Sequence, residues 1–396
     1  MSHQLSRIEK PLRIYIVVGE DSGDQLGVNL LVSLRKLVEP RKIEFFGIAG
    51  DRMKHAGLSS LFPLSDIAVM GLSAIIWNFP RIYRRANQII DDIVAIKPDV
   101  LIIIDSPDFT QPVARRAKRR LNGNLKVVKY VSPSVWAWRP GRAKKMSGFV
   151  NHILALLPFE PDVHKKLNGP PCTYVGHPLI EQKLKLRGSS ADKKSLEDAP
   201  VLVVLPGSRS GEVTRLMPVF GEVVARLKMV YPNLEILLPC VSHQKSNVLR
   251  LMSFWPVQAS IIEGESGKWQ AFRSAHAALA ASGTVTLELA IAHVPTVVAY
   301  KLDWLANKLK FLVNVPSFVL ANLVLGKKVM PEFLDEKANC ENLFTSLKPL
   351  LVESDARNTQ LLSLQNIDLM MELENDQPSM CAGKIVLREI GSLQES

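Results

Sequence analysis

At 396 residues the chain is longer than one hydrophobic core usually supports, which predicts two domains. Its 47% hydrophobic and 22% charged residues exclude a disordered chain. The formal net charge of +11 favours a phosphate-bearing partner: a nucleic acid, an anionic membrane or a phosphorylated substrate. The four cysteines form no CxxC pair, so we expect neither a disulfide framework nor a zinc site, and a cytoplasmic protein.

Several signatures are absent from the sequence. No stretch approaches the ~18 uninterrupted apolar residues of a membrane span. The eight histidines show no HxH or HExxH spacing, so we expect no metal and no cofactor. The basic residues are dispersed without an RNA-recognition or helix-turn-helix pattern, which argues against a nucleic-acid partner.

Short apolar runs alternate with amphipathic stretches through the first half of the chain. The runs are apolar at nearly every residue, as is typical of parallel strands buried on both faces. This alternation predicts a doubly wound α/β domain. The expected strands are Ile14–Val18, Ile43–Ile48, Val100–Ile104, Val127–Val131, Ile153–Leu156 and Cys172–Val175. The expected helices are Gln25–Val38, Pro80–Ile96 and Pro112–Arg120.

The alternation stops at residues 184–199, a polar stretch that is the best linker candidate. We therefore expect a first domain at 1–183, a second α/β domain at 200–355, and C-terminal helices at 356–396, with helix throughout Lys337–Gln394. Because ligands bind at the carboxyl ends of such strands, two facing domains predict one deep cleft. The expected strands are Val201–Leu205, Ile236–Leu238, Ala259–Ile262, Ala277–Ala280 and Thr296–Ala299, and the expected helices are Thr214–Val230, Lys268–Ser274 and Thr284–Ala292.

The turn after the first strand, Gly19–Asp24, carries three carboxylates. Its glycines allow close approach of the backbone, and the following helix supplies free N–H groups. Carboxylates repel phosphate, so an acceptor sugar fits better than a dinucleotide. The candidate acceptor residues are Glu20, Ser22, Gly23 and Asp24. A capped strand-to-helix turn is an equally weighted alternative.

Asp105 directly follows the apolar strand Val100–Ile104 and is the candidate catalytic base. A carboxylate at a strand end lies at the rim of the expected cleft, where it could take a proton from a hydroxyl nucleophile. Asp108, three residues on, is better explained as the N-cap of the next helix.

The run Tyr130–Arg139 combines turn-forming residues, two tryptophans and a cation. This composition is typical of a site for a large ligand that is partly apolar and partly anionic. Trp136, Trp138 and Arg139 are therefore candidate acceptor-binding residues, and Arg139 or Arg142 is a candidate phosphate contact. A buried aromatic corner is the alternative. His177 joins this set because of its place between the two domains, although a lone histidine is more often structural.

Two strand-to-helix turns in the second half suit a nucleotide. Small residues, an arginine and helix starts predict a clamp for a diphosphate, and a carboxylate one turn into the helix predicts a contact with ribose hydroxyls. The candidate nucleotide-binding residues here are Gly207, Ser208, Arg209, Ser282, Gly283, Thr284 and Glu288.

The segment from Val69 to Arg85 joins large apolar residues to an arginine cluster. It predicts a segment that lies on a membrane interface, and a core helix with outward cations is weighed equally. The candidate membrane-contact residues are Ile75, Ile76, Phe79, Arg81, Arg84 and Arg85. A second basic cluster at residues 115–120 is explained first as a solvated helix face and second as a site of attraction to anionic lipid.

These motifs, in this order, resemble the lipid-A-disaccharide synthases, the inverting glycosyltransferases of Gram-negative outer-membrane lipid synthesis. The resemblance covers about residues 12–336, and Tyr130–Trp138 is its most specific string. The matching segments are Gly19–Asp24, Gly47–Met53, Val69–Gly71, Asp105–Phe109, Tyr130–Arg139, Leu157–Glu160, Gly176–His177, Leu205–Val213, Ser282–Glu288 and Asn322–Leu323.

The resemblance implies a GT-B fold of two Rossmann-like domains that face each other across a cleft, with the last helices packing back toward the first domain. It implies transfer of 2,3-diacylglucosamine from its UDP derivative to the 6-hydroxyl of 2,3-diacylglucosamine 1-phosphate, giving a β-1,6 linkage and UDP without a metal. It adds Asn322 to the nucleotide site. It also implies peripheral association with the cytoplasmic face of the inner membrane, and it leaves a homodimer open.

A UDP-sugar 2-epimerase is the alternative enzyme class, since it shares the fold and the cleft. Epimerases act on soluble sugars, however, and need neither the tryptophan pair nor an apolar segment at residues 70–79. The sequence therefore favours the transferase.

Overall fold

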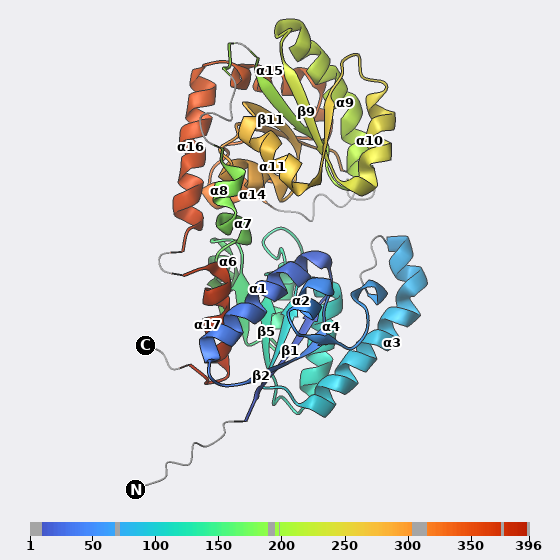
Figure 1. Cartoon of the computed structure of the whole chain (residues 1–396), viewed down its shortest axis with the longest axis vertical. Coiled ribbons are helices and arrows are strands. Elements are labelled where there is room, and N and C mark those ends of the chain that lie inside the picture. Colours follow the sequence, from blue (N-terminus) through green and yellow to red (C-terminus); the bar gives the residue numbers. More distant parts are fainter. Residues whose placement is uncertain are drawn as a thin grey trace. The chain divides into compact units, whose positions relative to one another are not determined.

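The structure is a computed structural model that describes residues 10–67, 72–188, 195–197, 199–302, 315–373 and 376–393. The chain divides into two compact units (Figure 1). Unit 1 comprises Met1–Pro178 and Leu373–Ser396, and unit 2 comprises Leu179–Glu372. The division thus falls at Leu179, before the expected linker at 184–199. It also divides the expected C-terminal helices at 356–396 between the two units.

The strands described for unit 1 form one parallel sheet in the order β3-β2-β1-β4-β5-β6-β7. The strands are β1 (Leu12–Val18), β2 (Ile43–Ile48), β3 (Ser59–Ser60), β4 (Val100–Ile104), β5 (Lys126–Tyr130), β6 (His152–Ala155) and β7 (Cys172–Tyr174). The helices are α1 (Asp21–Val38), α2 (Asp51–His55), η1 (Leu64–Asp66), α3 (Leu72–Ile96), α4 (Pro107–Arg120), α5 (Gly141–Met146), α6 (Glu160–Lys166) and α17 (Pro378–Glu389).

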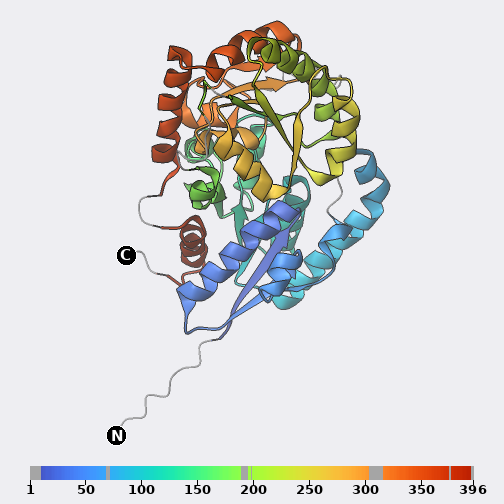
Figure 2. The ribbon, with the colours of Figure 1, turned by 45° about the horizontal axis from the view of Figure 1, so that its top comes forward.

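The sheet of unit 1 is buried on both faces, which is why its strands are apolar at nearly every position. On one face Ile14, Ile16 and Ile102 pack with α1 and α17. On the other face Leu101 and Ile103 pack with the buried sides of α3 and α4. The last helix, α17, lies along α1 in both views (Figures 1 and 2).

The strands described for unit 2 form a second parallel sheet, in the order β10-β9-β8-β11-β12-β13. The strands are β8 (Val201–Leu205), β9 (Glu235–Cys240), β10 (Ser260–Glu263), β11 (Ala277–Ala281), β12 (Thr296–Tyr300) and β13 (Glu332–Leu334). The helices are α7 (Pro178–Glu181, at the border of the units), α8 (Lys183–Leu186), α9 (Ser210–Val230), η3 (Ser242–Gln244), α10 (Lys245–Met252), α11 (Gly264–Ser274), α12 (Val285–Ile291), α14 (Leu320–Leu325), η5 (Asp335–Lys337), α15 (Cys340–Leu347), η6 (Lys348–Leu351) and α16 (Asp355–Met371).

Both sheets have the Rossmann order, in which the chain turns back across the first strand to start the second half. The reversal falls between β1 and β4 in unit 1 and between β8 and β11 in unit 2. At each reversal the loops that follow two adjacent strands leave the same edge of the sheet in opposite directions. Ligands of this fold bind at that point, so a site is expected at each of these two edges.

Several helices begin earlier than the sequence predicts. Helices α1, α4, α9 and α11 begin four or five residues before the expected Gln25, Pro112, Thr214 and Lys268. Their first turns are rich in glycine, serine and carboxylates, which have low helix propensity and resemble loop residues. The tail is also not helical throughout, because Glu372 ends α16 in an extended conformation and α17 begins only at Pro378.

No helix within the described ranges is both long enough and apolar enough to span a membrane.

Candidate active site

The loops after β1 and β4 meet at the chain reversal of unit 1. The register pairs Val18 with Ile104, so both loops leave the sheet at the same level. The Ser106 hydroxyl donates to Glu20 Oε1 at 3.1 Å, and the Ser22 hydroxyl lies 3.4 Å from Asp105 Oδ2. The structure therefore brings Glu20, Ser22 and Asp105 together, as the strand-end argument predicts.

Asp105 has an unusual backbone conformation. Asp105 and Ser106 have φ values of +54° and +36°, a left-handed region that non-glycine residues adopt at an energetic cost. The surroundings hold the turn in place: the Thr110 hydroxyl donates to the Asp105 carbonyl at 2.8 Å, and the Ser106 N–H donates to Asp105 Oδ1 at 2.9 Å. Two consecutive strained residues at a strand end are typical of a functional turn.

A fully buried lysine lies beneath this turn. Lys129 on β5 is 0% exposed, and its Nζ lies 3.4 Å from the Asp105 carbonyl oxygen. Burial lowers the pKa of Lys129 to about 8, and the negative charge of Asp105 opposes that shift. Lys129 was not among the predicted site residues, although a lysine within an otherwise apolar expected strand is a signal that could have found it.

Not every residue of the Gly19–Asp24 turn faces this site. Asp24 is 0% exposed, and its carboxylate accepts N–H bonds from Gly50, Arg52 and Met53 at 2.8–3.3 Å. It thus fixes the start of α2, so its prediction as an acceptor contact is corrected to a structural role. Gly23 is buried against Ile104 and Val18 and allows close helix–strand packing.

Asp108 is not the N-cap of α4, because Ser106 occupies that position. Its exposed carboxylate lies in the first turn of α4, where it pairs with Arg142 at 2.5 Å.

The Tyr130–Arg139 run is braced against α6. The Ser132 hydroxyl contacts His164 Nε2 at 2.9 Å, and Trp136 packs edge-on against Phe159 with ring centroids 5.5 Å apart. The buried Glu160 carboxylate accepts the Leu157 N–H at 3.1 Å, and burial raises its pKa to about 7. Burial also lowers the pKa of His164 to about 4. Trp136 is therefore partly a packing residue.

Trp138, Arg139 and His177 occupy different places. The Arg139 guanidinium lies 5.2 Å from the ring centroid of Trp138. Both residues belong to the loop that follows β5, the strand next to β4. His177 follows β7, which β5 and β6 separate from β4, so its strand lies about 14 Å from that of Asp105. The structure does not bring His177 to the turn at Asp105, and burial lowers its pKa to about 4. Its assignment to the acceptor site therefore stays a prediction that the geometry at Asp105 does not support.

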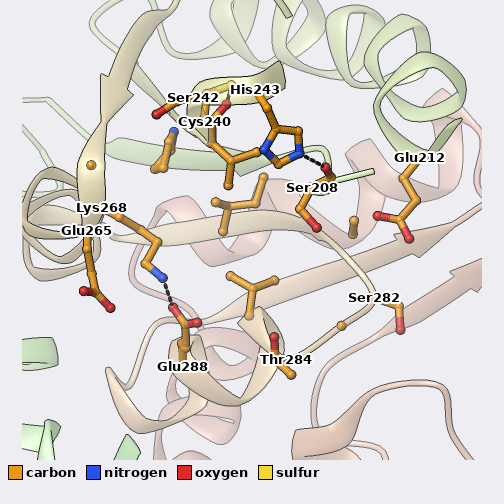
Figure 3. A pocket seen from close by; sticks show the side chains of 18 residues that line it. Ser208, Glu212, Cys240, Ser242, His243, Glu265, Lys268, Ser282, Thr284 and Glu288 are labelled. Carbon is orange, nitrogen blue, oxygen red and sulfur yellow. Dashed lines mark hydrogen bonds and ion pairs between the residues drawn. The ribbon is translucent and has the colours of Figure 1, made fainter. Parts of the chain in front are cut away.

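Unit 2 holds a pocket of about 570 Å³ at its own chain reversal (Figure 3). The loops after β8, β9 and β11 and the start of α11 form its wall. Among its lining residues are Gly207, Ser208, Ser282, Gly283, Thr284 and Glu288, six of the residues predicted to bind a nucleotide. Gly207 has φ +109°, and a Cβ there would lie 2.7 Å from Glu212 Oε2, so only glycine fits this turn.

Two contacts order the polar groups of this pocket (Figure 3). Lys268 Nζ lies 2.6 Å from Glu288 Oε2, and His243 Nε2 donates to the Ser208 carbonyl at 3.0 Å. Lys268 and His243 were not predicted. His243 comes three residues after the end of β9, so the strand-end rule used elsewhere could have found it; Lys268 sits one turn into a helix whose start was placed too late.

Two other predicted nucleotide residues lie elsewhere in unit 2. Arg209 is the N-cap residue of α9 and pairs with Glu212 at 3.1 Å; its side chain is 78% exposed and is not part of the pocket wall. Asn322 is 2% exposed, and its amide bonds Met330 N–H and carbonyl, each at 2.9 Å, and Val329 N–H at 2.9 Å. These bonds use the donor and acceptor groups of the amide. Asn322 is therefore corrected from a ligand contact to a residue that holds the loop after α14 in place.

From Leu72 on, the predicted membrane segment forms the start of α3, and its residues 69–71 lie outside the described residues. The side chains of Ile75 and Ile76 lie outside the described residues. Phe79 is 60% exposed and stacks with Tyr83, which is 53% exposed, and Arg81 and Arg84 are also exposed. Arg85 instead turns inward, to Asp66 at 2.5 Å and over the Phe62 ring, so it is corrected from a membrane contact to a structural ion pair.

Within the described residues, no three His, Cys, Asp or Glu side chains gather in a way that could hold a metal ion.

Two parallel sheets in the Rossmann order, each with a ligand-type edge, define the GT-B class of enzymes. Solved structures agree at the level of the fold. An S. aureus MnaA–UDP co-structure matches with a TM-score of 0.61 at 14% identity over 97% of this chain and 98% of that one. A Neisseria meningitidis UDP-GlcNAc 2-epimerase bound to UDP-GlcNAc gives a TM-score of 0.58 at 13% identity over 96% and 100%.

Sequence comparison is more specific than the fold. Residues 14–386 match the lipid-A-disaccharide synthetase family. The lipid-A-disaccharide synthase of Nitrobacter hamburgensis is 46% identical over 95% of both chains, and that of Rhodopseudomonas palustris (strain HaA2) is equally similar over the same share. The chain therefore belongs to the lipid-A-disaccharide synthase family, which confirms the resemblance seen in the motifs.

Proposed function

We propose that this protein transfers 2,3-diacylglucosamine from its UDP derivative to the 6-hydroxyl of 2,3-diacylglucosamine 1-phosphate. The products are the β-1,6-linked disaccharide 1-phosphate and UDP. The observation that carries the proposal is the family membership over residues 14–386 together with a carboxylate held at the chain reversal of unit 1 and a polar pocket at that of unit 2.

In this proposal Asp105 is the general base. Its carboxylate takes the proton of the acceptor 6-hydroxyl as that oxygen attacks C1 of the donor sugar, and the bond between C1 and the UDP oxygen breaks. The electron pair of that bond leaves on the diphosphate, and attack from the opposite side inverts C1. The strained turn and its hydrogen bonds hold the carboxylate ready at the strand end. Glu20 and Ser22 bind hydroxyl groups of the acceptor.

The UDP moiety occupies the pocket of unit 2. Ser282, Gly283 and Thr284 leave room for the diphosphate, since a Cβ at Gly283 would meet no atom within 4 Å. Glu288, paired with Lys268, accepts hydrogen bonds from the ribose hydroxyls. Two structurally similar proteins were solved with UDP or a UDP-sugar, which supports a nucleotide of this kind.

Mass spectrometry of the product tests this function and separates it from the epimerase alternative. Incubation with UDP-2,3-diacylglucosamine and the 1-phosphate acceptor is expected to give the disaccharide 1-phosphate and one UDP for each bond formed. Without acceptor, no product is expected. An epimerised UDP-sugar formed without acceptor would contradict the proposal and favour the epimerase.

We further infer that the start of α3 contacts the cytoplasmic face of the inner membrane, where both lipid substrates lie. The stacked, exposed Phe79 and Tyr83, next to Arg81 and Arg84, suit an interface of acyl chains and anionic headgroups.

Replacement of Ile75, Ile76 and Phe79 by Ser tests the membrane contact. The variant is expected to release the protein from anionic vesicles in a flotation assay while UDP binding stays unchanged. A matched triple Ser variant of the exposed Leu362, Leu369 and Met370 on α16 is the control. Unchanged vesicle binding of the α3 variant would show that the segment is not the membrane contact.

A further inference from the structure

A second pocket, of about 520 Å³, lies in unit 1 beside the start of α4. One wall comes from α4 (Pro107, Asp108, Gln111 and Arg115) and the other from the end of the tryptophan run and α5 (Arg139, Arg142 and Lys145). We name it the basic pocket, because four cations and one carboxylate line it. By contrast, three carboxylates and one lysine line the pocket of unit 2.

The cations of the basic pocket are poorly compensated. Arg142 pairs with Asp108, and the Arg139 guanidinium lies over Trp138. Arg115 and Lys145 have neither a hydrogen bond nor an ion pair with any described residue. Cations gathered around one cavity repel each other, so the arrangement is stabilised when an anion enters. One arginine side chain can donate two parallel N–H bonds to two oxygens of the same phosphate group. The arginines of the pocket therefore favour a phosphate as the anion.

We infer that the basic pocket binds the phosphate monoester of the acceptor sugar, a role that rests on the proposed function. Pro107, which lines the pocket, is two residues from Asp105, so their Cα atoms are at most about 7 Å apart. The acceptor carries its reactive 6-hydroxyl and its 1-phosphate on the same sugar ring. The near edge of the pocket therefore lies within about one sugar ring of the base, so one acceptor molecule can reach both.

Arg139 also has a strained backbone, with a φ of +52°. It lies between the tryptophan run and α5, and it lines the pocket. The basic cluster at residues 115–120 is divided accordingly. Arg115 lines the pocket, whereas Lys118 binds the Phe149 carbonyl and Arg120 pairs with Asp91.

The experiment compares Arg115→Gln with a matched control, Arg119→Gln. Both arginines are exposed on α4, but Arg119 does not line the pocket. Kinetics are measured with the 1-phosphate acceptor and with the same acceptor carrying a free 1-hydroxyl. Arg115→Gln is expected to raise KM for the phosphorylated acceptor about tenfold or more. It is expected to leave KM for the 1-hydroxyl acceptor and the affinity for UDP within twofold of the wild-type values. Arg119→Gln is expected to leave KM within twofold for both acceptors.

Equal increases in KM for both acceptors would overturn the inference, because the effect would not depend on the phosphate. Loss of binding to anionic vesicles with unchanged KM would also overturn it, in favour of a membrane phosphate. Unchanged kinetics in the double variant Arg115→Gln/Arg139→Gln would overturn the phosphate-site inference while leaving the proposed function intact.

A binding assay without turnover separates this inference from the proposed function. Titration of glucosamine 1-phosphate, followed by ³¹P NMR, is expected to show binding that Arg115→Gln weakens and Arg119→Gln does not. If the wild-type protein forms no disaccharide but this difference persists, the transferase proposal fails and the phosphate site stands. If the variants bind glucosamine 1-phosphate equally, the phosphate site fails.

Discussion

The chain reversals of the two units share one architecture and differ in their chemistry. In both sheets the first strand lies beside the strand that starts the second half, and both loops leave at the same edge. In unit 1 these loops carry Glu20, Ser22 and a strained Asp105. In unit 2 they carry Gly207 and the small residues Ser282–Thr284 around an open pocket. The fold thus provides two equivalent edges. Under the proposed function, the loop residues give a proton-transfer role to one and a binding role to the other.

The strands beneath the two edges differ as well. Lys129 pairs in register with Ile103, one residue before the end of β4, and Val298 pairs in the same way with Ala280 of β11. Both are buried, but only the first is ionisable. A buried lysine at this position lowers stability, because burial disfavours its charged form. Unit 1 has this cost at the edge that holds Asp105, and unit 2 does not have it at the edge that forms the pocket.

The largest expected effect concerns Asp105. We predict that Asp105→Asn lowers kcat about 10²- to 10⁴-fold, because the amide cannot accept the proton of the acceptor. The affinity for UDP is expected to stay unchanged, since the pocket belongs to unit 2. Steady-state kinetics and UDP calorimetry measure the two quantities, with Asp162→Asn, an exposed residue of α6, as control. Full activity in a folded Asp105→Ala protein would remove Asp105 from the mechanism.

The next effect tests the buried lysine. The pKa of Lys129 is lowered from 10.5 to about 8, so between these values the unfolded chain binds a proton that the folded chain does not. Stability therefore rises with pH in this window, and the full penalty is present below pH 8. We predict that Lys129→Met, which makes unit 1 resemble unit 2 here, raises the free energy of unfolding at pH 7 by up to about 3 kcal/mol and flattens the rise.

Urea titrations at pH 7 and pH 10, followed by pulsed hydrogen exchange of peptides from β4 and β5, report on unit 1 in this experiment. Lys126→Met, at the exposed start of the same strand, is the control and should change neither value. A less stable Lys129→Met protein at pH 7 would mean that the contact with the Asp105 carbonyl outweighs the burial of the charge.

The smallest predicted effect tests the binding role of the unit 2 edge. A side chain at Gly283 has free space in the empty pocket, so Gly283→Leu should fold normally and occupy the diphosphate position. We predict a loss of UDP affinity of about tenfold or more, or about 1.4 kcal/mol. Gly148→Leu, at an exposed glycine of unit 1, is the control. Equal UDP affinity in both variants, measured by calorimetry, would place the nucleotide elsewhere.

The sequence was informative about strands because they are buried on both faces. Each expected strand lies within a few residues of an observed one, since a buried parallel strand must be apolar throughout. Helix starts were less predictable. The first turns of α1, α4, α9 and α11 come directly after strand-end loops and contain polar or glycine residues. Such residues have low helix propensity, so they resemble loop residues in the sequence.

The candidate site shows the same division. The strand-end rule found Asp105, Glu20 and most of the unit 2 pocket, because these residues directly follow apolar runs. It failed for Asp24, whose side chain turns inward to hold backbone groups. The expectation for Asn322, which came from the resemblance, failed for the same reason. Residue type and spacing do not tell whether a polar side chain points to a ligand or to the main chain.

The sequence by itself determined the family, the parallel α/β class and the strand ends where the candidate site residues lie, because buried strands and strand-end turns leave local patterns. Only the tertiary structure decided which of those ends meet. Strand order placed Asp105 beside Glu20 and set the strand before His177 three places away from that of Asp105. Helix packing gathered Arg115, Arg139, Arg142 and Lys145 around one cavity. Such neighbours are far apart in the chain, and their approach depends on the order of strands in the sheet, which no local pattern contains.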